Sequence, residues 1–112
     1  MKVNQKNFWN NKLKEFDCLY QSDSNKFYNN FNFIKKIIAK KVSLSMNKRF
    51  DILSNYLIKL DLTNKKILEI GCGGGRLTKL LLEQKAKVTA VDFSSQAIEL
   101  TQNICQNSPN LK

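Results

Sequence analysis

Residues 67–82, ILEIGCGGGRLTKLLL, hold all four glycines of the chain, between a short apolar run and a leucine-rich segment. The run KILEIG and the later run AKVTAVD are mostly apolar and β-branched, which is typical of strands. Between them, Leu77, Leu80 and Leu81 of RLTKLLLEQK share one helical face. A strand, a helix and a second strand form a βαβ unit, whose strands are parallel and whose crossover is right-handed. The sequence therefore predicts an α/β fold built on a parallel sheet.

The residues before this unit have a helical pattern up to about position 64. QSDSN and VSLSMN are expected to break this pattern into separate helices, because Ser and Asn are good helix caps. A later helix is predicted at SSQAIELTQNICQ, which Ser94 or Ser95 would cap and Pro109 would end. We therefore divide the chain into an N-terminal helical region, 1–64, and an α/β part, 65–112. Three apolar stripes define the N-terminal helices: Trp9, Leu13, Phe16 and Tyr20; Phe27, Phe31, Ile34 and Ile38; and Phe50, Leu53, Leu57 and Leu60.

The charge of the chain is strongly positive, with 19 basic and 9 acidic residues and a formal net charge of +10. Clustered cations bind nucleic acid because they release counterions from its phosphates. Nearly all of these cations are lysines spread along the chain, however, and arginine occurs only at Arg49 and Arg76. A nucleic-acid surface is therefore the less favoured interpretation of the charge.

Other chemistries are restricted by composition. The chain has no histidine, which removes His-based triads and His metal ligands from these residues. Cys18, Cys72 and Cys105 are far apart, so we expect reduced thiols and no metal site. No apolar run approaches the roughly 18 residues of a membrane span, and the first residues lack the apolar core of a secretory signal. We expect a cytoplasmic protein without a membrane span.

The glycine cluster lies at the position where a βαβ unit binds ligands, beyond the carboxyl end of its first strand. Glycines there permit positive φ angles and let a ligand approach the backbone closely. The helix that begins near Arg76 adds free amides and a positive dipole end, which suit a carboxylate or a phosphate. We infer that a ligand lies on this turn.

The spacing of the glycines restricts the ligand. A dinucleotide fingerprint that starts at Gly71 and Gly73 needs a third glycine where Arg76 stands, and no P-loop sequence is present. The pattern that fits is Glu69-x-Gly71-x-Gly73-x-Gly75. Asp92 ends the second strand 21 residues after Gly71, close to the roughly 20 expected for a carboxylate that binds ribose hydroxyls.

ILEIGCGGG followed by VTAVDFS resembles the first two motifs of class I S-adenosylmethionine-dependent methyltransferases, over Lys65 to about Gln106. The resemblance implies a Rossmann-like parallel sheet, of which this chain holds the first βαβ unit, and S-adenosylmethionine as cofactor. It implies that Gly71, Gly73 and Gly75 form the turn beneath the methionine part of the cofactor. Glu69 would hold the turn or, through water, the cofactor ammonium; alternatively it caps turn amides.

The resemblance also implies roles for four other residues. Asp92 would bind the ribose diol, and Phe93 would flank adenine or else pack in the core. Cys72 occupies a slot for a small residue and is interpreted as packing. Arg49, in SMNKRFDIL, is similar to an arginine that meets the cofactor carboxylate in O-methyltransferases of quinone biosynthesis, although a solvated Arg49 fits the sequence equally well.

The expected function is therefore a methyltransferase that acts on a small molecule. A nucleic-acid (RNA) methyltransferase and a non-catalytic fragment or subunit that keeps the cofactor cradle stay open as alternatives. The sequence identifies no catalytic base, methyl acceptor or oligomeric state. NSPNLK ends the chain where a third strand should begin, so we expect a truncated domain whose remainder comes from the rest of the gene or from a second chain. The isolated chain of 112 residues is expected to be inactive.

Overall fold

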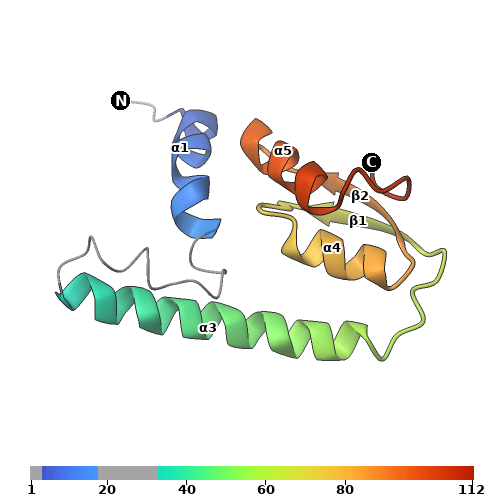
Figure 1. The fold of residues 1–112 in the computed structure, drawn as a ribbon, viewed down its shortest axis with the longest axis horizontal. Helices are drawn as coiled ribbons and strands as arrows, with labels where there is room; N and C mark the ends of the chain where they lie inside the picture. Colours follow the sequence, from blue (N-terminus) through green and yellow to red (C-terminus); the bar gives the residue numbers. More distant parts are fainter. Residues whose placement is uncertain (1–3, 18–32) are drawn as a thin grey trace.

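The computed structural model describes residues 4–17 and 33–112. Within these residues, the helices α1 and α3 precede a small α/β unit (Figure 1). The elements in chain order are α1 (Gln5–Asp17), α3 (Phe33–Leu57), β1 (Lys66–Ile70), α4 (Arg76–Glu83), β2 (Lys87–Val91) and α5 (Ser95–Ile104). Among the described residues, no helix has the length and apolar character needed to cross a membrane.

The two strands are parallel and adjacent, with Lys66 opposite Lys87 and Ile70 opposite Val91. This confirms the α/β fold class and the βαβ unit inferred from the glycine-rich segment. The last residues of the chain pair with the other edge of β2, because the Lys112 N–H donates to the Val88 carbonyl and the Ala90 N–H donates to the Lys112 carbonyl, both at 2.9 Å. A third parallel strand thus begins where the sequence predicted one.

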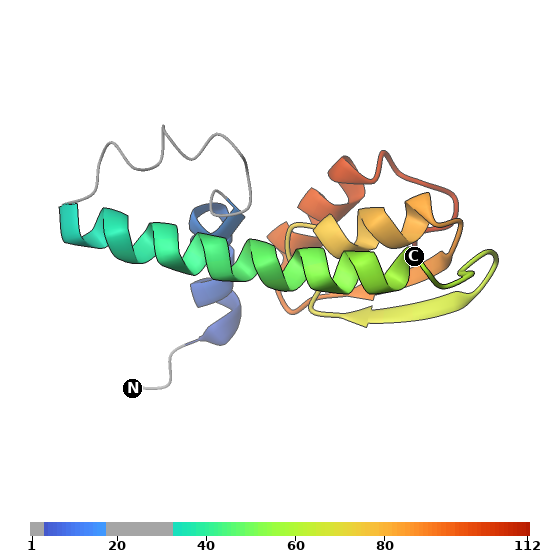
Figure 2. The same ribbon diagram turned by 90° about the horizontal axis from the view of Figure 1, so that it is seen from below.

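One face of the sheet is covered by helices, and Figure 2 shows α4 and α5 on the same side of the two strands. Leu81, Ala86 and Val88 form the buried centre of this layer, against which Ile67 of β1 and Leu111 also pack. The opposite face presents Leu68 and Ile70, whose side chains are 62% and 80% exposed. The apolar core of the α/β unit therefore lies between the sheet and α4.

The long helix α3 differs from the sequence prediction, because it continues through VSLSMN without a break. Serine and asparagine lower helix stability by only about 0.5 kcal/mol each relative to alanine. Tertiary contacts at the end of this stretch and just after it offset this cost. Asn47 accepts a hydrogen bond from Arg76, and the Arg76 guanidinium lies 3.8 Å from the centre of the ring of Phe50, which follows the stretch. The apolar stripe residues Tyr20, Phe27 and Phe31 lie outside the described residues.

Helix α5 begins as the sequence predicted, with Ser94 as its N-cap and the Ser94 hydroxyl accepting the Ala97 N–H at 3.3 Å. It ends earlier than expected, at Ile104. Gln106 and Asn107 adopt φ angles of 51° and 49°, so the backbone has already left the helical region before Pro109.

Candidate functional site

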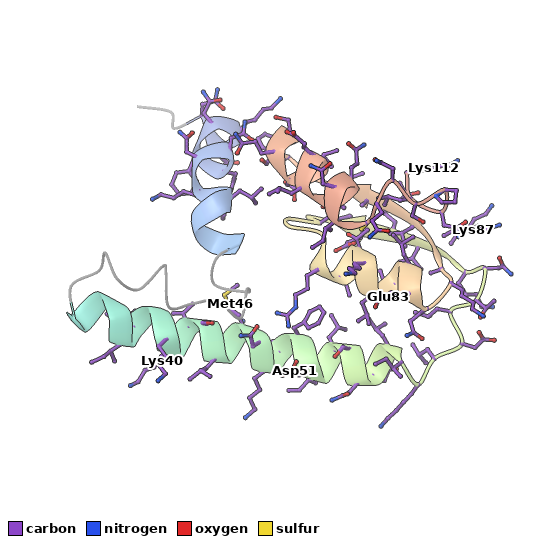
Figure 3. All side chains as sticks on the ribbon, in the orientation of Figure 1. Lys40, Met46, Asp51, Glu83, Lys87 and Lys112 are labelled. Carbon is purple, nitrogen blue, oxygen red and sulfur yellow. The ribbon has the colours of Figure 1, made fainter. Side chains whose placement is uncertain are left out.

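A cavity of about 730 Å³ lies at the carboxyl ends of β1 and β2, within the size range of small-molecule sites. Its floor consists of strand ends and the glycine turn, and its wall comes from α1 and α3. Figure 3 shows Met46 on the side of α3 that faces α1, with Lys40 on the opposite side. The lining residues are Trp9, Leu13, Met46, Ile70, Gly71, Gly73, Gly74, Val91, Asp92, Phe93 and Ser94.

Gly71 and Gly73 form the open part of the turn. Their φ angles are +80° and +54°, in the left-handed region that favours glycine, and a Cβ atom built at either position meets no atom within 4 Å. The N–H groups of Gly71 and Cys72 both donate to the Val91 carbonyl, at 2.7 and 3.2 Å, which fixes the turn to the end of β2. The turn therefore offers a bare backbone surface to the cavity.

Gly75 has a different environment, although the sequence groups it with the other turn glycines. It is buried, it is the N-cap of α4 with a φ of +79°, and it does not line the cavity. A Cβ atom at this position would lie 2.8 Å from both the Thr101 Cα and the Ile104 Cγ2. The structure thus uses Gly75 to bring α4 against α5. Gly74, which the sequence analysis did not single out, does line the cavity.

Asp92 lies at the end of β2 and faces the glycine turn. Its Oδ2 accepts the Gly73 N–H at 2.9 Å, and its Oδ1 accepts the Ser94 N–H at 2.8 Å. A carboxylate offers about four lone-pair sites, so each oxygen retains capacity for a further donor. Asp92 therefore connects the turn to the start of α5 and can still accept two hydroxyl groups from a ligand.

Glu69 points away from the cavity, toward α4. It is 9% exposed, and its Oε2 accepts the Thr78 hydroxyl at 2.5 Å. Burial raises the pKa of this carboxyl group, the Thr78 hydrogen bond opposes that rise, and the charge of Asp92 adds to it. The sequence analysis missed Thr78; its position three residues before Leu81, on the buried face of α4, was the available signal.

The cysteines in the described residues are packing groups. Cys72 is buried and accepts a weak hydrogen bond from the Thr101 hydroxyl at 3.4 Å. Burial raises the pKa of the Cys72 thiol and also that of Cys105, so both thiols are neutral near pH 7. Cys18 lies outside the described residues. Within residues 4–17 and 33–112, no cluster of His, Cys, Asp and Glu side chains could hold a metal ion.

The remaining predicted residues differ in their relation to the cavity. Phe93 is 65% exposed and lines it beside Asp92, so this ring is not part of the core. Arg49 is exposed on α3 and does not line the cavity, whereas Met46 of the same helix does. Arg76 donates to the Asn47 Oδ1 at 2.7 Å and thereby joins α4 to α3. The sequence analysis assigned Trp9 and Leu13 to helix packing only and missed their place in the cavity wall.

Comparison with known proteins finds similarity to methyltransferases in the α/β part of the chain. Residues 67–112 match a family model described as a methyltransferase domain. Over 49 residues the chain is 47% identical to the mitochondrial ubiquinone biosynthesis O-methyltransferase of Schizosaccharomyces pombe, covering 44% of this chain and 18% of that protein. The corresponding enzyme of Pasteurella multocida is 46% identical over 39 residues, 35% of this chain and 16% of the relative.

A relative of another class matches a longer part of the chain. The ribosomal RNA small subunit methyltransferase A of Mesomycoplasma hyopneumoniae is 33% identical over 73 residues, 65% of this chain and 28% of that enzyme. The chain thus spans less than a third of the length of these curated relatives. No solved structure matches it.

Proposed function

We propose that this chain, whose residues 67–112 belong to the class I S-adenosylmethionine-dependent methyltransferases, binds S-adenosylmethionine in the cavity above the glycine turn. The observation that carries the proposal is the arrangement of Asp92 beside Gly71 and Gly73. The carboxylate has lone pairs left for the vicinal hydroxyls of ribose, and the two glycines leave open backbone where the methionine part would lie. Together they supply the cofactor site of a methyltransferase.

The residues around the cavity fit this cofactor. Phe93 beside Asp92 offers an exposed ring to the adenine, while Ile70 and Val91 provide apolar surface at the strand ends. The cofactor supplies a methyl group on a sulfonium ion, which an acceptor attacks in line. The chain contributes by orienting the reactants and by excluding water. Asp92 already accepts two backbone N–H groups, so we assign it to binding and not to proton transfer.

The methyl acceptor that we favour is a small molecule. Asp92 is the charged side chain of the cavity, and no lysine or arginine of the described residues lines it, despite the net charge of +10. A wall of Trp9, Leu13 and Met46 suits an apolar acceptor better than a polyanion. The ubiquinone biosynthesis O-methyltransferases among the relatives support the same class.

An RNA acceptor is the second candidate. It is favoured by the ribosomal RNA methyltransferase that matches 65% of the chain, and by the excess of lysine. Transfer of a radiolabelled methyl group separates the two candidates: incorporation into small phenols supports the first, and incorporation into ribosomal RNA supports the second. Because the chain spans less than a third of its relatives' length, this assay uses the full-length protein. If the full-length protein binds the cofactor but transfers no methyl group, a non-catalytic subunit is supported.

Titration calorimetry tests the cofactor itself. The chain should bind S-adenosylmethionine or its demethylated product, S-adenosylhomocysteine, more tightly than nicotinamide dinucleotides, because Arg76 replaces the third glycine of the dinucleotide fingerprint. Tighter binding of a nicotinamide dinucleotide would contradict the proposal.

A further inference from the structure

Helix α1 contributes to the cavity although it is far in sequence from the glycine turn. Figure 1 shows α1 beside α5, and both Trp9 and Leu13 of α1 line the cavity. Leu13 is 8% exposed, so one face of the helix is anchored, while Trp9 is 42% exposed at the cavity wall. Helix α1 therefore supplies part of the cavity wall, beside Met46 of α3.

A hydrogen-bonded chain joins α1 to the ligand-facing carboxylate. The Ser94 hydroxyl, which is fully buried, donates to the Asn10 Oδ1 at 2.5 Å. The backbone N–H of the same Ser94 donates to the Asp92 Oδ1, and the Asp92 Oδ2 accepts the Gly73 N–H. A continuous series of hydrogen bonds thus runs from the cavity wall to the glycine turn, through Asn10, Ser94, Asp92 and Gly73.

We infer that Asn10 is a positioning residue: through Ser94 it holds α1 against the α/β unit, so that Trp9 and Leu13 close the cavity over a bound adenosyl ligand. The inference rests on the proposed function. Ligand affinity then depends on the fraction of molecules in which α1 is docked, because only the docked form has a complete wall. Loss of the Asn10 contact lowers this fraction and weakens binding without changing any group that the ligand touches.

The chain offers a matched control one residue away. Asn11 is exposed on α1 and does not line the cavity, so Asn11→Ala changes helix propensity as Asn10→Ala does but leaves the Ser94 contact intact. Asn10→Asp is the conservative variant, because it keeps an acceptor oxygen for the Ser94 hydroxyl. Ser94 itself is left unchanged, since its hydroxyl also caps α5.

Trp9 is the single tryptophan of the 112 residues and reports directly on the wall. Binding of S-adenosylhomocysteine, measured by calorimetry, should weaken about two- to tenfold in Asn10→Ala, the range expected for one hydrogen bond. Acrylamide should quench Trp9 fluorescence more strongly in this variant before ligand is added. Asn11→Ala should match the unaltered chain in both measurements, and Asn10→Asp should recover most of the affinity.

The outcomes separate this inference from the proposed function. If the unaltered chain binds no S-adenosylhomocysteine, the proposed function fails and the inference falls with it. If the unaltered chain binds the ligand but Asn10→Ala and Asn11→Ala behave alike in affinity and quenching, the inference alone is wrong. A loss of helical circular dichroism across the whole chain in Asn10→Ala would also overturn it, because Asn10 would then be needed for folding.

Discussion

Replacing Asp92 by asparagine tests both functions of the carboxylate at once. Asparagine keeps one acceptor oxygen but carries an NH₂ group in place of the other, and this group cannot accept a backbone N–H. Either Gly73 or Ser94 therefore loses its partner, whichever way the amide is turned. Hydrogen bonds to a charged group contribute about 1.5–3 kcal/mol each. Without ligand, we expect Asp92→Asn to lower the free energy of unfolding by about 1–3 kcal/mol.

The same substitution should weaken ligand binding by a separate amount. The neutral amide has one oxygen for the two ribose hydroxyls and no charge to strengthen those bonds. Loss of about 1.4 kcal/mol is one decade in affinity, so the dissociation constant for S-adenosylhomocysteine should rise about tenfold or more. The thermal stabilisation that the ligand gives should shrink accordingly.

Calorimetry and thermal unfolding, each with and without S-adenosylhomocysteine, measure the two effects. Asp51→Asn is the matched control, because Asp51 is exposed on α3 and lies outside the cavity lining. It should change neither quantity appreciably. If Asp92→Asn loses stability but binds the ligand as tightly as the unaltered chain, Asp92 only fastens the turn, and the ribose assignment is wrong.

Three further substitutions test the surroundings of the site. Gly75→Ala should lower the free energy of unfolding by at least 2 kcal/mol, about 1 kcal/mol more than Gly71→Ala. Both glycines have the same positive φ, but only at Gly75 would a Cβ atom meet α5. Equal thermal stabilities of the two variants would contradict the packing role. Glu69→Gln should be more stable than the unaltered chain above pH 4.5 and equally stable below it. The raised pKa of Glu69 means that the charged carboxylate destabilises the folded state, and glutamine carries no charge. Parallel curves of stability against pH for the two forms would refute this. Arg76→Ala should lower the free energy of unfolding by about 1–3 kcal/mol and speed amide hydrogen exchange in α3, because the contacts with Asn47 and Phe50 are lost. The control Lys79→Ala, on the exposed surface of α4, should change neither quantity.

The α/β unit could be predicted from the sequence because its determinants are local. Apolar runs of strand length, a leucine face of helical period and a glycine cluster between them specify a parallel βαβ unit without further information. The start of α5 followed from Ser94 in the same way, since an N-cap acts on amides two or three residues away. Asp92 faces the turn because both strands end at the same edge of the sheet.

The contacts between distant elements could not be predicted. Gly75 looks like Gly71 in the sequence, and only the packing of α5 reveals that its Cβ position is occupied. Trp9 belongs to a helical stripe, and Met46 lies in VSLSMN, which the sequence predicted to break the helix. The place of both residues in the cavity wall followed only from the docking of α1 and α3. The continuity of α3 has the same origin, because contacts made by Asn47 and Phe50 outweigh a weak local preference.

A crystal structure of the chain with S-adenosylhomocysteine is the most direct test of the central claim. The account predicts that the ribose hydroxyls lie within hydrogen-bonding distance of both Asp92 carboxylate oxygens, about 2.5–3.0 Å, and that the methionine part lies over Gly71 and Gly73 with Gly75 out of contact. A ligand bound elsewhere, or one whose ribose leaves Asp92 bonded only to Gly73 and Ser94, would contradict it.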